Sequence, residues 1–374
     1  MASWQRHPKE YLRCAVALSA ALVPSLAVPG CFVGHRHLRH TLITAVCVSP
    51  AGRQVAFNLT RPNHPTTVYV LRLADTDGKL ARTFQKAGSV EVVGWCDDKE
   101  LYLLDNHRIL RYEMASGKRA SVSVHLPPAG GRERRIIHAA YVASLDLFVI
   151  LARIGDSGDA IYAASPRSGK AETIARGRLV VHASGVVEHK RMISMIASER
   201  GTSPELPSAA AFRLYRYPPA VPPVTFSLPI CRGAAGLGDI TPDGATAVLP
   251  YREYPWKPPR CYLYVVDLLG RRVRHKAALN GGVSVIRTGD ANGFLVVGPD
   301  TFATFSIRNF QLKPMPGGPI GTPSSMAVTA DMRAVIATTE LELYVVDIKT
   351  GKRRLLWRAP GGDSRKTSPS QGPH

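Results

Sequence analysis

One proline-rich stretch, YREYPWKPPR at positions 251–260, has the composition of a binding surface. It combines aromatic side chains with cations, which are enriched at binding hot spots, and its prolines reduce the conformational entropy that is lost on binding. We therefore predict that a protein or an acidic partner is bound here. The predicted contact residues are Arg252, Tyr254, Trp256 and Lys257. The alternative interpretation is a proline-stiffened loop that only caps the neighbouring strands.

A catalytic alternative depends on acids and histidines elsewhere in the chain. The groups available to a hydrolase or lyase are Asp156, Asp159, Asp300, Glu340 and His107. No spacing among them assigns the roles of acid, base or nucleophile. The GDSGD sequence at 155–159 is similar to the nucleophile region of chymotrypsin-like proteases, but the nearest histidine, His138, lacks the sequence that surrounds the base of those enzymes. The pattern favours a binding protein over an enzyme.

The sequence contains no motif for a cofactor or a resident metal. The SGKAET stretch at 168–173 lacks the glycine spacing of a phosphate-binding loop, and no two cysteines form a CxxC pair. The histidines of GHRHLRH, at 34–40, have no acidic or thiolate ligand beside them except Cys31. We therefore interpret residues 32–40 as a basic, His-rich tether, and we predict neither a cofactor nor a metal.

The net charge of +20 and the pI of about 10.0 favour anionic partners. A field of that sign attracts nucleic acids, acidic glycans and anionic lipid headgroups. The cations are nevertheless spread along the chain in short groups, and the sequence contains no zinc-finger spacing, RRM signature or basic helix. We therefore predict a protein or an acidic polymer as the partner, without sequence-specific binding of nucleic acid.

Residues 1–31 resemble a bacterial export leader. A basic opening leads into an apolar run of 15 residues, from Cys14 to Val28, which is too short for a membrane-spanning helix but suits the core of a signal peptide. The run continues as Val28-Pro29-Gly30-Cys31, which is similar to a lipobox except at Pro29. Three alternatives stay open: a lipid on Cys31, plain export, and a cytoplasmic protein with an apolar N-terminal segment. We expect an exported, periplasmic or membrane-anchored protein that contacts the membrane only through the leader or its lipid.

A repeated phrase indicates the architecture. LYVVDIKTGKRR at 343–354 nearly duplicates LYVVDLLGRRVR at 263–274. Both read as an apolar strand, a short polar turn with Gly-Lys or Gly-Arg, and a second strand. A different turn, written SPAG at 49–52 and TPDG at 241–244, joins two further strands upstream in each unit.

Together the two patterns define a unit of four antiparallel strands, A to D, which recurs with a period of about 45 residues. Such units are typical of β-propellers, and no convincing helical periodicity follows residue 40. We predict an all-β chain that forms a seven-bladed β-propeller of four-stranded antiparallel blades over residues 41–360. The small, polar residues 361–374 are expected to form a disordered tail.

The phrases SPAG…AF at 49–57 and LYVVD…GK at 343–352 resemble the repeats of TolB-type, WD-like β-propellers. The resemblance implies the fold only, because propellers include enzymes, adaptors and receptors. Since strand directions alternate, every B–C connection emerges on the same face as the D–A connections. That face, the usual ligand side of propellers, would also carry Arg61, His64 and His107. We expect a monomeric, non-catalytic binding or scaffold protein of the cell envelope that uses this face. The alternative is a propeller enzyme with its site at the mouth of the central channel.

Overall fold

The computed structural model describes residues 41–359, with gaps at 62–63, 75–79, 85–89, 129–133, 156–157, 178, 188–189, 200–209, 219–221, 229–237, 254–259, 289, 330 and 332. The described residues form 28 β-strands and one short 3-10 helix, Ala143–Leu145, so the predicted all-β class is confirmed. The predicted leader with Cys31, the tether and the tail all lie outside the described residues. Within the described ranges, no helix has both the length and the apolar character needed to span a bilayer.

Consecutive strands form four-stranded antiparallel units, which we number in chain order. Unit 1 contains β1 (Leu42–Val48), β2 (Gln54–Thr60), β3 (Thr67–Arg72) and β4 (Leu80–Phe84). Unit 2 contains β5 (Val90–Trp95), β6 (Glu100–Asp105), β7 (Arg108–Glu113) and β8 (Arg119–Val122). Unit 3 contains β9 (Arg134–Val142), β10 (Leu147–Ile154), β11 (Asp159–Ala164) and β12 (Ala171–Arg176).

The remaining strands repeat this organisation. Unit 4 contains β13 (Leu179–Val187), β14 (Met192–Glu199), β15 (Ala210–Tyr217) and β16 (Val224–Leu228). Unit 5 contains β17 (Gly238–Ile240), β18 (Thr246–Glu253), β19 (Arg260–Asp267) and β20 (Arg272–Leu279). Unit 6 contains β21 (Ser284–Arg287), β22 (Gly293–Val297), β23 (Phe302–Ser306) and β24 (Gln311–Pro314). Unit 7 contains β25 (Pro323–Val328), β26 (Arg333–Thr338), β27 (Glu342–Asp347) and β28 (Arg353–Arg358).

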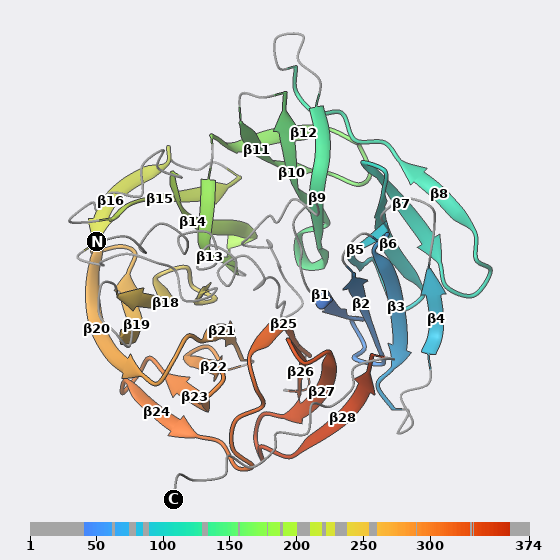
Figure 1. Cartoon of the computed structure of the whole chain (residues 1–374). Helices are drawn as coiled ribbons and strands as arrows, with labels where there is room; N and C mark the ends of the chain where they lie inside the picture. The colour runs from blue at the N-terminus through green and yellow to red at the C-terminus, as the bar shows by residue number, and fades with distance from the viewer. Residues whose placement is uncertain are drawn as a thin grey trace, which may run out of the picture.

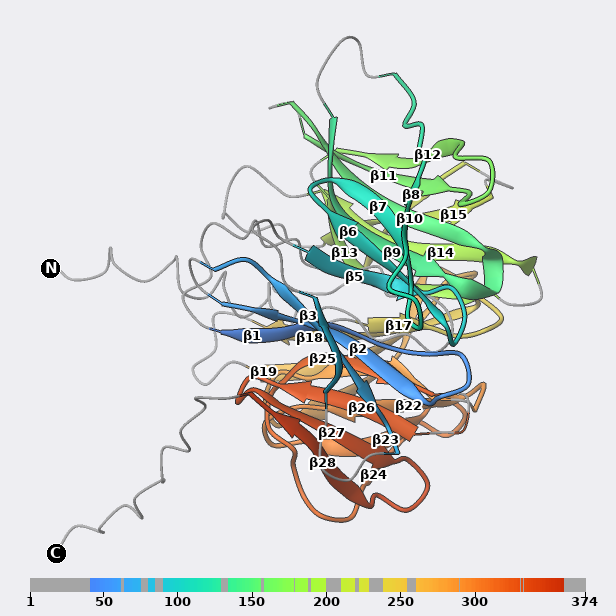
Figure 2. The ribbon, with the colours of Figure 1, turned by 90° about the vertical axis from the view of Figure 1, so that its right-hand side faces the viewer.

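The units are arranged around a common centre. In Figure 1, first strands such as β1, β9 and β25 lie toward the middle, and fourth strands such as β8, β20 and β28 lie at the rim. Figure 2 shows the same sheets from the side. The described strands form five four-stranded sheets and one eight-stranded sheet, in which units 4 and 5 are joined by parallel pairing of β13 with β17.

The phrase LYVVD forms the third strands β19 and β27, and its aspartate closes the turn that follows. Asp267 and Asp347 each accept a backbone N–H of their own turn at 2.8 Å. Four residues after the aspartate the backbone is left-handed, with φ of 71° at Gly351 and 52° at Arg271. In unit 5 the glycine of the phrase, Gly270, therefore lies one residue before the position that needs it.

The apolar core lies between neighbouring units. Each cluster of buried apolar side chains in the described part of the chain joins two successive units. Between units 2 and 3, for example, the rings of Tyr102 and Phe148 meet edge to face with centroids 4.8 Å apart. A sheet with two apolar faces is thus covered on both sides by its neighbours.

The ring closes between unit 7 and unit 1 through side chains. Among the described strands, β25–β28 and β1–β4 form separate sheets, and neither sheet receives a strand from the other. Trp357 of β28 packs against Phe57 and Tyr69 of unit 1, with ring centroids 5.0 Å and 5.4 Å away. The Arg354 guanidinium adds a polar contact by donating to the Leu73 carbonyl oxygen at 2.6 Å.

Replacement of the closing tryptophan tests whether the ring depends on this contact. Trp357 is 8% exposed, so Trp357→Ala is expected to lower the free energy of unfolding by about 3–5 kcal/mol. Urea denaturation provides the measurement. Leu269→Ala is the matched control, because Leu269 is 72% exposed and its loss should cost less than about 0.5 kcal/mol. Similar losses in the two variants would contradict closure by side-chain packing.

The strained turn of unit 5 gives a second prediction. Arg271→Gly should raise the free energy of unfolding by about 1 kcal/mol, because glycine adopts a positive φ without the steric cost paid by arginine. Arg272→Gly, one residue later in the extended strand β20, should instead lower it by about 0.5–1 kcal/mol. Urea denaturation measures the free energy of unfolding of both variants. An equal change in the two would be inconsistent with strain at Arg271.

Candidate functional site

The connections between strands lie on two opposite faces of the ring. We call one the loop face; it carries the connection from the second to the third strand of each unit and the connections between units. The other, which we call the turn face, carries the connections from the first to the second and from the third to the fourth strand. This division follows from the antiparallel order within each unit.

The residues predicted to bind a partner lie on the loop face in separate units. Arg61 and His64 are exposed in the β2–β3 connection. His107 is exposed between β6 and β7, and its Nδ1 lies 2.7 Å from the Ile136 carbonyl oxygen. Arg252 belongs to β18, but its side chain lies outside the described residues, as do Tyr254, Trp256 and Lys257. The structure therefore does not test the predicted contact at 251–260.

The acids of the catalytic alternative are also distributed over separate units. Asp159 begins β11, and its Oδ1 lies 3.3 Å from the Arg153 guanidinium. Asp300 and Glu340 are exposed in the β22–β23 and β26–β27 connections, whereas Asp156 is outside the described residues. Among the members of this set that the structure describes, no acid and base are brought together.

Charge is distributed unequally between the two faces. The described turn-face connections contain eleven lysines and arginines against six aspartates. The described loop-face connections contain one arginine, Arg61, against Asp300 and Glu340. Among the described connections, positive charge is therefore concentrated on the turn face.

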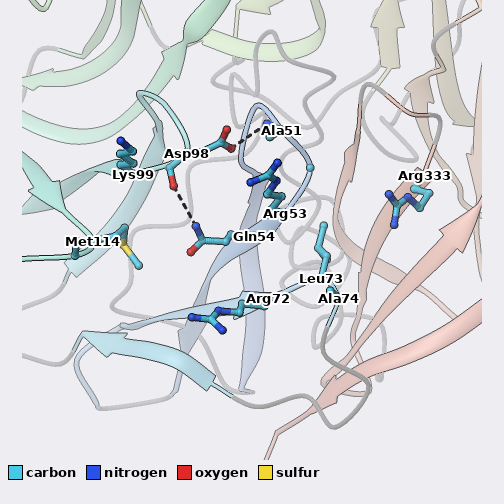
Figure 3. Close-up of a pocket in the computed structure, with 12 residues that line it drawn as sticks. Ala51, Arg53, Gln54, Arg72, Leu73, Ala74, Asp98, Lys99, Met114 and Arg333 are labelled. Atoms are coloured by element: carbon cyan, nitrogen blue, oxygen red, sulfur yellow. Dashed lines mark hydrogen bonds between the residues drawn. The ribbon is translucent and has the colours of Figure 1, made fainter.

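The turn face contains a cavity of about 820 Å³ where units 7, 1 and 2 meet, shown in Figure 3. We call it the turn-face groove. Its size lies within the usual range of ligand sites. The residues that line it are Ala51, Gly52, Arg53, Gln54, Arg72, Leu73, Ala74, Asp98, Lys99, Met114, Ala115 and Arg333. Sequence reasoning missed this set, since its members come from four connections and three strand ends in three units.

Asp98 fixes the turns of units 1 and 2 against each other. Its Oδ1 accepts the backbone N–H of Ala51 at 2.9 Å, and its carbonyl oxygen accepts a hydrogen bond from Gln54 Nε2 at 3.1 Å. Both bonds are drawn in Figure 3. On the same turn Asp97 accepts the backbone N–H of Lys99 at 2.7 Å. The groove is therefore built on turns whose backbone is held in place.

Three of the four cations in the groove have no anionic partner among the described residues. The side chains of Arg53, Arg72 and Lys99 make no ion pair or hydrogen bond there, whereas Arg333 donates from Nε to Asp331 at 2.7 Å. Elsewhere on the turn face Arg167 pairs with Asp146 at 2.7 Å. Like charges that gather in one cavity repel each other, and an anion that enters the cavity removes this repulsion.

A second polar group, buried beneath the loop face, joins units 4 and 5. His182 lies at a bulge of β13, a feature that redirects a side chain. Its Nε2 is 2.7 Å from Ser198 Oγ, and its Nδ1 is 3.0 Å from the Tyr251 hydroxyl. The order of groups is that of a nucleophile, a base and an orienting residue. Burial lowers the pKa of His182 to about 4.

The chemistry of this group supports a structural role. A base that takes a proton from serine becomes an imidazolium, which needs a nearby carboxylate for stabilisation. Here the orienting group is Tyr251, whose own pKa is raised by burial. We therefore interpret Ser198, His182 and Tyr251 as a neutral hydrogen-bonded chain that connects β14, β13 and β18.

Two further ionisable pairs lie on the first strands. Asp239 of β17 accepts the backbone N–H of Arg287 at 2.8 Å. Burial raises the pKa of Asp239 to about 6, although the Arg287 charge acts in the opposite direction. Between units 2 and 3, Glu91 Oε2 lies 3.4 Å from His138 Nδ1. In the sequence each of these groups is an isolated polar residue within or beside a short strand, which is too weak a signal to assign a role.

Comparison with known proteins supports the fold. No protein-family model and no curated protein matches the chain. Among solved structures it is similar to a puromycin-hydrolyzing peptidase from Mycobacterium tuberculosis, with a TM-score of 0.56 and 16% identity over 91% of this chain and 57% of that one. It is also similar to a puromycin hydrolase, with a TM-score of 0.57 and 16% identity over 85% of this chain and 54% of that one.

The fold is a β-propeller. A further similar structure is the dihydro-heme d1 dehydrogenase NirN in complex with DHE, with a TM-score of 0.52 and 14% identity over 85% of this chain and 67% of that chain. The chain spans little more than half the length of either puromycin hydrolase. At these identities the likeness extends to the fold alone, so the activity of the propeller cannot be carried over from them.

His182 and Asp239 generate a prediction about pH dependence. Between about pH 4 and 6.5 the unfolded chain binds a proton at His182 that the folded chain does not, so this contribution to stability falls as pH decreases. Asp239 acts in the opposite direction. Between about pH 3.8 and 6 the folded chain binds a proton at Asp239 that the unfolded chain does not, so the contribution of Asp239 to stability falls as pH rises. The two contributions oppose each other in the wild-type protein.

The corresponding single variants separate the two contributions. We compare the change in unfolding free energy between pH 6.5 and pH 4.5 in each variant with the same change in the wild-type protein. For His182→Gln this change should be more favourable than in the wild-type protein by about 2 kcal/mol, because the variant has no histidine to protonate. For Asp239→Asn it should be less favourable than in the wild-type protein. Urea denaturation at the two pH values provides the measurement. Changes of the same sign in both variants would show that the two groups do not oppose each other.

Proposed function

We propose that this protein is a non-catalytic β-propeller that binds an anionic partner through the turn-face groove. The observation that carries the proposal is that Arg53, Arg72 and Lys99 line one cavity, where none of them has an anionic partner among the described residues. The net charge of +20 adds long-range attraction for such a partner. Guanidinium groups suit the recognition, because they bind carboxylates and phosphates through two parallel hydrogen bonds.

The turn face is a different surface from the one that the sequence indicated. Alternation of strands placed the candidate residues on the loop face, where the described connections contain little positive charge. We keep the contact at 251–260, with Arg252, Tyr254, Trp256 and Lys257, as a proposed second surface. The groove is supported by its lining, its volume and the hydrogen bonds that hold its turns together.

We propose that the ring has seven blades, one for each four-stranded unit, and that the repeats are of the TolB type. Support comes from the apolar clusters, each of which joins two successive units, including unit 7 with unit 1. The eight-stranded sheet counts as two blades, since β13 and β17 pair over only two residue pairs.

Export of the chain, with a lipid on Cys31, remains our proposal for its location at the cell envelope. β1 begins at Leu42 on the loop face. An anchor at Cys31 would hold that face toward the membrane and would present the turn-face groove to soluble partners. We expect the anchored protein to act as a monomer that recruits its partner to the envelope.

The enzyme alternative has weaker support. The described acids Asp159, Asp300 and Glu340 belong to three different units, and the contact of Ser198 with His182 is completed by a tyrosine and not by a carboxylate. The similar solved structures include hydrolases, but they share the fold at 16% identity only.

Removal of two groove cations tests the proposed function. A fluorescently labelled polyglutamate is titrated against the full chain at low salt, and binding is followed by anisotropy. Arg72→Gln with Lys99→Gln should weaken binding about 10-fold or more, and added salt should weaken binding of the wild-type protein. The stability of the variant should stay equal or rise, because two cations without partners are removed from a strongly basic chain.

The matched control removes the same two charges elsewhere on the turn face. Arg308→Gln with Lys349→Gln lies in units 6 and 7, outside the groove, and should weaken binding by less than about 3-fold. Equal losses of polyglutamate affinity in the two double variants would show that binding depends on the total charge of the face and not on the groove. Binding of polyglutamate to the Arg72→Gln, Lys99→Gln variant with the affinity of the wild-type protein would disprove the proposed function.

A further inference from the structure

The turn-face groove contains a hydrogen-bond acceptor as well as donors. Gln54 Nε2 donates to the Asp98 carbonyl oxygen, and this fixes the orientation of the amide because a carbonyl oxygen can only accept. Gln54 Oε1 accepts no hydrogen bond among the described residues. Arg53 and Arg72 carry donors only. A ligand that satisfies the whole wall must therefore offer anionic acceptors together with at least one donor.

Part of the wall is apolar. Met114, Ala115, Ala51 and Ala74 line the groove together with the cations. In Figure 3 Met114 lies beside Lys99 on the unit 2 side of the cavity, and Arg333 lies on the opposite side. A methionine side chain adapts its shape to an apolar group that is placed against it. An anion without apolar groups would leave this part of the wall without a complementary contact.

The wall also contains one carboxylate. Asp98 is held in place by the backbone N–H of Ala51 at 2.9 Å, so it stays between the cations of units 1 and 2. A uniform polyanion, such as a phosphate chain, would place a negative group near Asp98 wherever it crosses the groove. A ligand in which acidic and neutral groups alternate avoids this repulsion.

From these three features we infer that the groove binds a peptide segment in which acidic residues alternate with apolar ones. Its carboxylates pair with Arg53, Arg72 and Lys99, a backbone N–H donates to Gln54 Oε1, and an apolar side chain contacts Met114. A volume of about 820 Å³ accommodates a segment of a few residues. This inference rests on the proposed function and specifies the class of anion that the groove selects.

Three probes test the inference on the full chain. Two are fluorescein-labelled, acetylated hexapeptides of equal charge, one with alternating glutamate and leucine and the other with alternating glutamate and serine. The third is inorganic polyphosphate, used as a competitor. We expect the glutamate–leucine peptide to bind about 10-fold more tightly than the glutamate–serine peptide. The comparison uses the wild-type protein, so it does not depend on the folding of any variant.

Substitution of the apolar wall locates the effect. Met114→Gln should reduce the affinity for the glutamate–leucine peptide about 5- to 10-fold and change the affinity for the glutamate–serine peptide less than 2-fold. Met114→Leu, which keeps the apolar surface, should restore the preference for leucine. Leu269→Ser is the matched control, since it removes an exposed apolar side chain of the same face in unit 5, outside the groove.

The outcomes separate this inference from the proposed function. Equal affinity for the two peptides, or a loss that is the same in Met114→Gln and Leu269→Ser, overturns the peptide inference. If polyphosphate then binds in a manner that requires Arg72 and Lys99, the groove is a general anion site and the proposed function stands. If neither the peptides nor polyphosphate bind at low salt, both proposals are wrong.

Discussion

The structure depends on one constraint: every sheet has two apolar faces, and each face must be covered by another sheet. A row of such sheets leaves one uncovered face at either end, so the row is stable in water only when it closes into a ring. Among the described strands of this chain, the end units share no sheet. Packing of the Trp357 ring against Phe57 and Tyr69 therefore holds the two units together where no shared strand does so.

The turn-face groove lies across this closing contact. Arg333 belongs to unit 7, Arg53 and Arg72 to unit 1, and Lys99 to unit 2. Any partner that spans the groove therefore contacts both sides of the place where the ring closes, and its binding free energy adds to the stability of the closed state.

The strands could be predicted because short stretches of sequence determine them, whereas the groove combines residues that are far apart in the sequence. Repeated turns such as SPAG and the aspartate of LYVVD encode structure over four to six residues, so the sequence alone places the strands that flank them. In the unit 5 turn Arg271 and not Gly270 has the left-handed backbone, a difference that the Gly-Arg pattern itself does not show. The groove depends on residues from Ala51 to Arg333 that no local pattern relates. His182 and Asp239 likewise acquire their roles only from neighbours on other strands.

Hydrogen bonds between units satisfy backbone groups on the inner edge of first strands, where no neighbouring strand pairs with them. An unpaired backbone N–H near the centre is costly unless a side chain accepts it. Ser325 of unit 7 accepts the N–H of Val46 at 3.0 Å, and Asp239 of unit 5 accepts that of Arg287 at 2.8 Å. In units 4 and 5 the first strands β13 and β17 instead pair directly with each other.

Glycine makes this direct pairing possible. A Cβ on Gly238 would lie 3.2 Å from the His182 carbonyl oxygen of β13, and one on Gly185 would lie 3.0 Å from the Ile240 side chain of β17. These two glycines therefore allow β13 and β17 to approach closely where they share hydrogen bonds. The joined sheet is therefore a consequence of two residues that lack side chains, while the other junctions of the ring depend on side chains to hold neighbouring units together.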